Sequence, residues 1–398
     1  MKNNNAKIIF HIDMNMFFCS VAVINNPSLK GKAFAIGREN SMKGVISTAS
    51  YEARKYGIHS AMPLVEAYRL LPSLIVVNPK FEEYRKYHNY FINLIKEYTN
   101  IIEVASIDEV YCDMSEISKR RNPIELAKEI QLRLVKEYHL PSSIGIAPTL
   151  FLAKMASDIK KPLGITVLRI REIDKILYEL PVGDIYGIGK KTEPRLVKKG
   201  IEKIKDFMNP DNSEIIIELI GERMYNGLKN ALTGHSSNIV DPNRYDESKS
   251  ISTSNTYDEY LYDIDDMKFE LINMAKKLHQ YLKTEDYLTK TISITLRDSN
   301  FQTITRSKTI EYTDDLYVIE DIIDDLLDEN YKEKEYRLLG VGFSNLIKNE
   351  DLPLEYNLFT WKSIFEKEDN INEIINDFKK KYGETFITKG VELKDKLE

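Results

Sequence analysis

The chain has 398 residues, of which 42% are hydrophobic, and its formal net charge is −6 at pH 7. This length exceeds what one hydrophobic core usually organises, so two to four domains are expected. No apolar run can span a bilayer, no signal-peptide core follows Met1, and Cys19 and Cys112 lack disulfide or Cys-x-x-Cys spacing; these features argue against a membrane or secreted protein and favour a cytoplasmic one.

The charge is unevenly distributed along the chain. Residues 1–82 and 151–200 hold more Lys and Arg than Asp and Glu, whereas residues 245–349 are acidic. The net negative charge argues weakly against a nucleic-acid partner, but the charge of each domain acts locally. A surface that binds phosphate is therefore expected in the first two stretches.

The first apolar segment, residues 8–14, predicts a buried strand that carries one carboxylate, Asp13. A helix over residues 14–22 is expected next, with Phe17 and Phe18 at its entry. Aromatic side chains at such a position usually belong to the core. The functional alternative is that Phe18, close to Asp13 in sequence, forms a wall of a pocket that holds a sugar.

Residues 45–57 predict a β-like run that passes into a helix whose first turns carry Thr48, Tyr51 and Arg54. Positions 51 and 54 are one helical turn apart and share a face. A hydroxyl and a guanidinium beside a helix start can bind a triphosphate. The alternative is a solvated amphipathic helix with Arg54 on its wet side.

Residues 101–114 predict a strand, a tight turn and a returning strand, with the adjacent carboxylates Asp108 and Glu109 at the turn. Adjacent acidic residues are costly to hold together unless a cation neutralises them. With Asp13, three carboxylates could meet at one sheet edge, and hard oxygen ligands of this number suit Mg²⁺. Two such ions assist phosphoryl transfer. The alternative is that Asp108 and Glu109 only solvate the turn.

Further helices are predicted over residues 81–99, 123–138 and 149–159, with a buried strand over residues 143–147. The aromatic stripe of the first helix is assigned to the core. The alternation predicts a small α/β sheet with helices packed on one face. The last helix ends at Lys160-Lys161-Pro162-Leu163-Gly164. Lysines favour helix C-termini for structural reasons alone, and the alternative is that Lys161 reaches a triphosphate.

Residues 181–207 predict two short helices around Gly187-Ile188-Gly189, followed by Lys190 and Lys191. The glycines let the backbone turn sharply and approach a phosphate, and the next helix offers unpaired N–H groups. This is the helix-hairpin-helix pattern, which binds the DNA backbone without reading sequence. Gly187, Gly189, Lys190 and Lys191 are therefore DNA-binding candidates.

A polar, turn-rich tether is expected over residues 235–248, and a new domain follows it. Its predicted order is strand 249–257, helix 265–283, strands 289–298 and 301–311, helix 314–329 and strand 336–346. This β-α-β-β-α-β order predicts a sheet with helices on one face. The opposite face, with Lys249, Arg297, Arg306 and Lys308 near its strands, is expected to be available to a polyanion.

The tail, residues 350–398, contains Leu358-Phe359 after a polar linker, which is typical of a short linear docking peptide. The alternative is a hydrophobic staple onto its own domain.

Together these segments resemble the Y-family DNA polymerases, most closely the DNA polymerase IV (DinB) group. The similarity runs from about Ile8 to Phe343, and it is strongest in four motifs, residues 10–22, 47–57, 106–109 and 160–164. The resemblance implies an α+β, multidomain fold of the right-hand polymerase type. Its expected parts are a palm with an α/β sheet (1–16 and 83–172), small fingers (17–82), a helix-hairpin-helix thumb (173–237), a linker (238–248), a β-α-β-β-α-β little finger (249–349) and a C-terminal tail (350–398).

The resemblance also implies roles for single residues. It makes Asp13, Asp108 and Glu109 the catalytic ligands of two Mg²⁺ ions, with the backbone carbonyl of Met14 completing the set. Phe18 becomes the steric gate, an aromatic side chain that excludes ribonucleotides because it clashes with their 2′-hydroxyl.

For the nucleotide, the resemblance implies that Tyr51, Arg54 and Lys161 hold the incoming triphosphate and that Thr48 assists. The motif around Gly187 would belong to the thumb.

The implied partners are primer-template DNA, dNTP and a sliding clamp, with no membrane, and a monomer is expected. In this family the tail motif binds the clamp, usually through a Gln three residues before a Leu-Phe pair. Here Glu355 occupies that position, while the hydrophobic pair of the motif is present as Leu358 and Phe359.

The expected function is template-directed, error-prone DNA synthesis of the translesion type. It would proceed by two-metal-ion transfer of a nucleotide to a primer 3′-hydroxyl, without a proofreading exonuclease. Two rivals remain. A palm-type nucleotidyl cyclase can use similar paired acids, and a non-catalytic DNA-binding scaffold could act through the helix-hairpin-helix and the tail.

Overall fold

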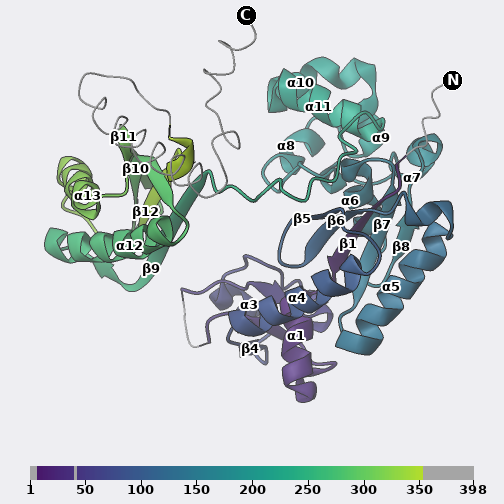
Figure 1. The fold of residues 1–398 in the computed structure, drawn as a ribbon, viewed down its shortest axis with the longest axis horizontal. Helices are drawn as coiled ribbons and strands as arrows, with labels where there is room; N and C mark the ends of the chain where they lie inside the picture. The colour runs from purple at the N-terminus through teal and green to yellow at the C-terminus, as the bar shows by residue number, and fades with distance from the viewer. Residues whose placement is uncertain (1–6, 40–42, 353–398) are drawn as a thin grey trace, which may run out of the picture. The chain divides into compact units, whose positions relative to one another are not determined.

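The structure is a computed structural model that describes residues 7–39 and 43–352. The chain divides into two compact units, Met1–Glu247 and Ser248–Glu398 (Figure 1). No helix within the described ranges is long and apolar enough to cross a membrane.

The first unit is built on a five-stranded sheet, which we call the central sheet, in the order β5-β6-β1-β7-β8. Its strands are β1 (Ile9–Met14), β5 (Ile102–Val104), β6 (Glu109–Asp113), β7 (Ser142–Ala147) and β8 (Ile165–Val167). The middle strand, β1, pairs antiparallel with both β6 and β7. All six residues of β1 are buried, as its apolar sequence predicts.

Helices cover both faces of the central sheet, so the expectation that they pack on one face is wrong. The side chains of Phe10 and Ile12 pack with helices α1 (Phe17–Asn25), α4 (Phe81–Lys96) and α5 (Pro123–Tyr138). Ile9 packs on the other face against α6 (Leu150–Ile159), which connects the parallel strands β7 and β8. Because successive residues of a strand point to opposite faces, His11 and Asp13 share the α6 face with Ile9.

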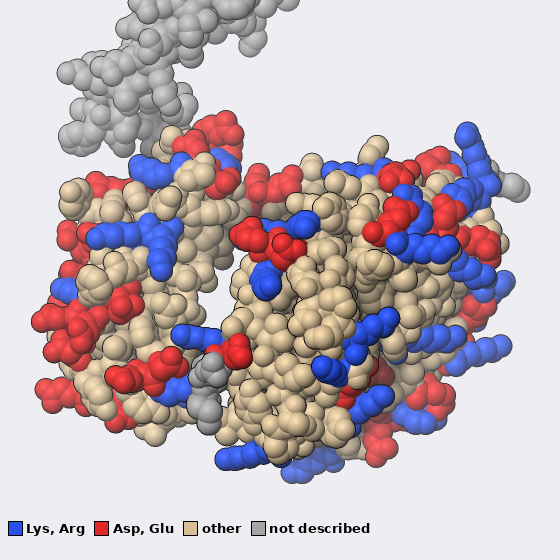
Figure 2. Space-filling model, turned by 90° about the horizontal axis from the view of Figure 1, so that it is seen from below, with Lys and Arg blue, Asp and Glu red and all other residues tan. Residues whose placement is uncertain are grey.

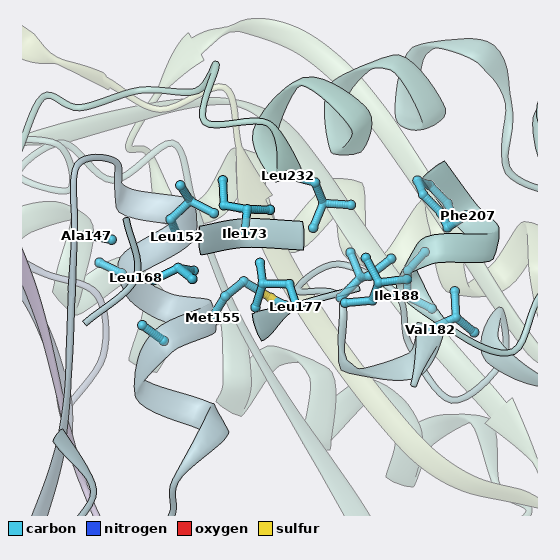
Figure 3. Packing of buried hydrophobic residues seen from close by; sticks show 14 of the residues in the cluster. Ala147, Leu152, Met155, Leu168, Ile173, Leu177, Val182, Ile188, Phe207 and Leu232 are labelled. Atoms are coloured by element: carbon cyan, nitrogen blue, oxygen red, sulfur yellow. The ribbon is translucent and has the colours of Figure 1, made fainter. Parts of the chain in front are cut away.

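The core on the α6 side continues into a series of short helices (Figure 3). These helices are α7 (Ile173–Ile176), α8 (Glu193–Val197), α9 (Ile204–Met208), α10 (Ser213–Ile220) and α11 (Glu222–Leu232). Leu152 and Met155 of α6 lie in one apolar cluster with Ile188, Phe207 and Leu232 from this region. The hairpin around Ile188 is therefore anchored to the central sheet through a continuous core.

A second, three-stranded sheet in the first unit has the order β3-β2-β4. It comprises β2 (Phe34–Ile36), β3 (Thr48–Ala49) and β4 (Ile75–Val77), accompanied by α2 (Tyr51–Arg54) and α3 (Leu64–Leu70). A separate small core, which includes Ile46, Leu64 and Val76, holds these elements together.

The segment before the second unit is bonded to the edge of the central sheet. The buried carboxylate of Glu103 on β5 accepts a hydrogen bond from the backbone N–H of Asp241 at 2.9 Å. Its other oxygen lies 2.6 Å from Nε of Arg244. Val240 is also buried in the α6-side core. The part of the expected tether up to Arg244 thus makes fixed contacts with the first unit.

The second unit is a four-stranded sheet in the order β11-β10-β12-β9, with β13 paired to β10. Its elements are β9 (Ser250–Leu261), α12 (Ile264–Thr284), β10 (Tyr287–Asp298), β11 (Thr303–Thr313), α13 (Leu316–Asn330), β12 (Tyr336–Ser344) and β13 (Ile347–Lys348). The two helices pack against Ile292, Ile294 and Leu296 of β10, which lie on one face of the sheet. Acidic side chains gather over α12 and α13, at the left edge of Figure 2.

Arg306 and Lys308 lie on the helical side of this sheet, which corrects the expectation that they serve its open face. Their register partners on β10 are the core residues Ile294 and Ile292. Arg306 Nε donates to Asn330 Oδ1 at 2.9 Å, and Lys308 Nζ lies 3.0 Å from Asp325 Oδ2 of α13. The alternate positions of β11 carry hydroxyls, at residues 303, 305, 307 and 309, and Arg297 Nε donates to the first of them at 2.7 Å.

Candidate active site

The three acidic residues singled out from the sequence meet at one end of the central sheet. Asp13 and Glu109 are register partners on β1 and β6. Asp108 directly precedes β6, and its carbonyl accepts a hydrogen bond from the backbone N–H of Met14 at 3.0 Å. Asp13 is buried at 5% exposure, whereas the Glu109 side chain is 26% exposed. The Asp108 carboxylate accepts from Ser106 Oγ at 2.6 Å.

Two lysines neutralise these carboxylates. Lys161 Nζ lies 2.6 Å from Asp13 Oδ2 and 2.6 Å from Asp158 Oδ1. Lys154 Nζ lies 2.6 Å from Glu109 Oε1 and 3.2 Å from Asp13 Oδ2. Sequence reasoning missed Lys154, because a lysine in a helix usually faces solvent. Its contact with the carboxylates becomes apparent only from the packing of α6 against one face of β1.

Burial and close pairing shift the proton affinities of these groups. Burial, reinforced by the hydrogen bond with Glu109, raises the pKa of Asp13 well above its ordinary value. Burial also acts to raise the pKa of Glu109, but the close contacts with His11, Asp13 and Lys154 outweigh it and lower that pKa. Burial opposes the charge of Lys154, yet the surrounding carboxylates raise its pKa. Carboxylates and lysine ammonium groups are therefore tightly coupled at this end of the sheet.

A cavity of about 310 Å³ opens beside the carboxylates. The expected site residues that line it are Asp13, Met14, Phe18, Thr48, Tyr51, Arg54, Asp108, Glu109 and Lys161. The structure thus brings together residues from four separate segments of the chain. The four hairpin candidates do not line this cavity.

Thr48 lies in strand β3 and not in the first turn of a helix, which corrects the expectation from the sequence. Helix α2 begins only at Tyr51, because Ser50 caps it: the Ser50 hydroxyl accepts from the backbone N–H of Ala53 at 3.2 Å. Arg54 Nε donates to the Ala49 carbonyl at 3.0 Å, and its guanidinium carbon lies 4.9 Å from the Tyr51 ring centroid. These contacts hold Tyr51 and Arg54 together at the cavity.

The ring of Phe18 packs against two aromatic side chains of α4. Its ring stacks on Tyr84 with centroids 4.0 Å apart and an interplanar angle of 7°. Phe81 meets Phe18 edge-on at 6.3 Å. Tyr84 is buried at 1% exposure, so the stack sets the orientation of Phe18. Of the aromatic stripe of α4, Tyr84 and Phe91 are core, as expected, whereas Phe81 and Tyr90 are exposed, and the packing against Phe18 was not foreseen.

A buried amide, Asn15, ties β1 to the loop that carries Lys161. Asn15 Oδ1 accepts from the backbone N–H of Leu163 at 2.9 Å, and Asn15 Nδ2 donates to Ser143 Oγ at 3.0 Å. The loop is tight, since a Cβ at Gly164 would lie 1.8 Å from the Lys160 carbonyl oxygen. Sequence analysis missed Asn15, although a polar residue at the end of an apolar strand is a signal.

His11 lies behind Glu109. Ser157 Oγ donates to the Lys154 carbonyl at 2.8 Å and lies 2.8 Å from His11 Nδ1, so Nδ1 carries the proton and donates to Ser157. Nε2 has no hydrogen-bond partner within the described residues and faces Glu109 Oε2 at 3.6 Å. Burial lowers the pKa of His11, which favours its neutral form.

The donor set suits a hard divalent cation, because it consists of carboxylates and a backbone carbonyl. In their present orientations, however, the side chains of His, Cys, Asp and Glu form no group of three within the described ranges that could hold a metal ion. Asp13 and Glu109 instead point oxygens at the ammonium groups.

The hairpin candidates do not line the cavity, although Lys190 Nζ lies 3.5 Å from Nδ1 of His59, the neighbour of the cavity residue Ser60. Gly187 has φ +106°, a conformation that favours glycine, and a Cβ at Gly189 would meet nothing within 4 Å. Lys190 and Lys191 are exposed, while Ile188 between the glycines is buried in the core. The hairpin thus presents open backbone and two cations from a fixed base. Leu358, Phe359 and Glu355 lie outside the described residues.

Three family models match the chain. Residues 12–158 match the impB/mucB/samB family, residues 171–201 match the IMS family HHH motif, and residues 248–355 match the impB/mucB/samB family C-terminal domain. The first match contains all three acidic residues of the site, and the second contains the hairpin glycines.

Relatives and solved structures agree with these matches. DNA polymerase IV of Oceanobacillus iheyensis is 37% identical over 391 residues, which cover 97% of this chain and 92% of that protein. DNA polymerase IV 1 of Bacillus subtilis is 38% identical, covering 98% and 94%. A Y-family DNA polymerase chimera of Dbh and Dpo4 has a TM-score of 0.75, and the insertion ternary complex of Dbh DNA polymerase has 0.61. Both are 28% identical to this chain and cover 86% of it and 100% of their own.

Proposed function

Since the chain belongs to the DNA polymerase IV group of the Y-family and is a DNA-directed DNA polymerase, we propose that it adds dNTPs to a primer 3′-hydroxyl by two-metal-ion transfer. The observation that carries this proposal is the meeting of Asp13, Asp108 and Glu109 in the lining of a cavity that Tyr51 and Arg54 also line. Carboxylates and phosphate-binding groups in the lining of one cavity suit a nucleoside triphosphate with bound metal.

The family implies dependence on divalent metal, and the proposed ligands of two Mg²⁺ ions are Asp13, Asp108, Glu109 and the Met14 carbonyl. Bound there, the metal would supply activation of the 3′-hydroxyl and neutralisation of the departing pyrophosphate. The chain itself positions the ligands: the β1–β6 pairing sets Asp13 against Glu109, and the Met14–Asp108 backbone bond fixes the turn.

For the nucleotide, we propose that Tyr51, Arg54 and Lys161 bind the triphosphate, with help from the Thr48 hydroxyl. Arg54 offers a planar donor set suited to phosphate oxygens, and Lys161 offers a compact charge. Phe18 would stand against the sugar and exclude a 2′-hydroxyl. The stack of Phe18 on Tyr84 supports this role, because a gate must be rigid to discriminate.

The DNA would be held by surfaces away from the cavity. Dbh DNA polymerase has been solved as a ternary complex, which supports primer-template DNA and nucleotide as partners here. We propose that residues 173–237 act as a thumb whose Gly187–Lys191 hairpin binds backbone phosphates. We assign the other parts as palm (1–16 and 83–172), fingers (17–82), linker (238–248), little finger (249–349) and a clamp-binding tail (350–398).

We further propose that synthesis is error-prone and can cross damaged templates without proofreading, because the proposed fingers, residues 17–82, are small and small fingers imply a roomy pocket. The test is extension of a primed template by the native chain with one dNTP at a time. The expected result is that the templated dNTP is added most efficiently, while the other dNTPs are misinserted at frequencies far above those of a replicative polymerase. Product from NTPs without template would favour the cyclase, and DNA binding without extension would favour the scaffold.

Replacing Tyr84 by Leu is expected to relax rejection of ribonucleotides by up to roughly tenfold, because the stack that orients Phe18 is worth about 0.5–1.5 kcal/mol. The measurement is the ratio of kcat/KM for dCTP and CTP. Tyr84→Phe keeps the ring and should keep the ratio. Tyr90→Leu is the matched control on α4, since Tyr90 stacks on Tyr138 away from the cavity. An unchanged ratio in Tyr84→Leu would show that Phe18 holds its orientation alone.

Replacing Asn15 by Ala is expected to raise KM for dNTP by about tenfold and to lower the free energy of unfolding by about 1–3 kcal/mol, because two buried hydrogen bonds are lost. The Lys161 loop would lose its attachment to β1. Ser143→Ala removes only one of these bonds and should have a smaller effect on both quantities. A loss of stability with KM unchanged would contradict the link between Asn15 and the nucleotide.

A further inference from the structure

Lys154 contacts two of the proposed metal ligands but has no place in nucleotide binding. Its side chain is 11% exposed, and its Nζ contacts Glu109 Oε1, Asp13 Oδ2 and, at 3.5 Å, Asp158 Oδ2. Of the described residues that line the cavity, the basic ones are Arg54 and Lys161. Lys154 therefore sits behind the carboxylates, on the side away from the entering substrate.

Lys154 and Lys161 differ in their freedom to move. Lys161 lies on the loop after α6, is 29% exposed and lines the cavity, so its ammonium can turn from Asp13 to a triphosphate. Lys154 lies within α6, between the buried residues Ala153 and Met155. Its carbonyl is bonded to Ser157, which in turn is bonded to His11. The bond fixes the backbone of Lys154, and the burial of its side chain together with its three carboxylate contacts keeps its charge beside the carboxylates.

We propose that Lys154 is a fixed counter-ion that keeps the metal-free site assembled and lowers its affinity for divalent cations until a nucleotide arrives. The inference rests on the proposed function, since it concerns the same ligands. An ammonium a few ångströms from a carboxylate stabilises it, and the same ammonium repels a dication held by that carboxylate. A triphosphate brings negative charge that offsets this repulsion.

The proposal predicts that removing the charge of Lys154 lowers the stability of the metal-free protein and raises its affinity for metal. Without Lys154, Asp13 and Glu109 repel each other, so the metal-free protein should be less stable. The same change removes repulsion of the cation, so metal affinity should rise. A purely structural lysine would give lower stability with unchanged or weaker metal affinity, because its loss would only disorder the ligands.

The experiment titrates Mn²⁺ into the full chain without DNA or nucleotide and follows free Mn²⁺ by electron paramagnetic resonance. Lys154→Met should bind Mn²⁺ about tenfold more tightly than the native chain. Its melting temperature in EDTA should fall, and Mn²⁺ should restore it. Lys128→Met is the matched control, because Lys128 pairs with Glu125 on the exposed face of α5.

Unchanged or weaker Mn²⁺ binding by a folded Lys154→Met chain would overturn the proposal. If the methionine variant does not fold, Lys154→Gln, which keeps an N–H donor and removes the charge, should show the same tighter binding. Asp108→Asn separates this inference from the proposed function. If that variant binds Mn²⁺ as well as the native chain does, the metal site itself is wrongly placed; if it loses binding, only the role of Lys154 is in question.

Discussion

Replacing Asp108 by Asn is expected to lower the rate of nucleotide addition by roughly 10³-fold while leaving primer-template affinity unchanged. Asn keeps the size of the side chain and its hydrogen bond with Ser106, but it removes the charge that would hold a metal ion. Asp108 is half-buried and forms no ion pair with another residue of the described ranges, so the variant should fold. The measurements are single-turnover extension and DNA binding by fluorescence anisotropy.

Glu116→Gln is the matched control for Asp108→Asn. Glu116 is an exposed carboxylate that pairs with Lys119 outside the cavity, so its loss changes net charge by the same amount without touching the site. Extension should remain at the native rate in this control. Native extension by Asp108→Asn itself would place the catalytic metal elsewhere.

Replacing Phe18 by Ala is expected to lower discrimination against ribonucleotides by roughly 100-fold, because the ring that would overlap a 2′-hydroxyl is removed. The kcat/KM for dNTP should fall much less, since the variant loses the clash with the 2′-hydroxyl of a ribonucleotide and keeps the groups that bind the dNTP. The measurement is kcat/KM for a dNTP and its matching NTP on the same template.

Phe18→Leu provides a size series for the gate, and its discrimination should lie between those of the native chain and Phe18→Ala. A series in which dNTP and NTP efficiencies fall together would contradict the gate. In that case Phe18 would contribute only to the core that it shares with Tyr84.

Much of the architecture follows from local signals in the sequence. Helix α5 occupies residues 123–138 as predicted, because Asn122 caps it and Pro123 occupies its first turn. The expected order of elements in the second unit is also present. The layers of the central sheet were harder to predict, because the α6 face of β1 is buried although it carries His11 and Asp13 beside Ile9, and the pattern does not say which helix covers each face.

The site shows the same division between local and tertiary information. The turn at Asp108 and Glu109 and the segment with Tyr51 and Arg54 carry short-range signals that predict their chemistry. Lys154, Asn15 and Tyr84 act through contacts with residues distant in sequence, and nothing in their own segments indicates those partners. Thr48 was misplaced because the capping role of Ser50 was overlooked.

The most direct test of the two-metal site is a crystal structure of the full chain with primer-template, a non-hydrolysable dNTP and Mn²⁺, using the anomalous signal of manganese. The account predicts two manganese peaks bound by Asp13, Asp108, Glu109 and the Met14 carbonyl, with the triphosphate against Tyr51, Arg54 and Lys161. Manganese peaks away from these carboxylates, or a triphosphate bound elsewhere, would contradict it.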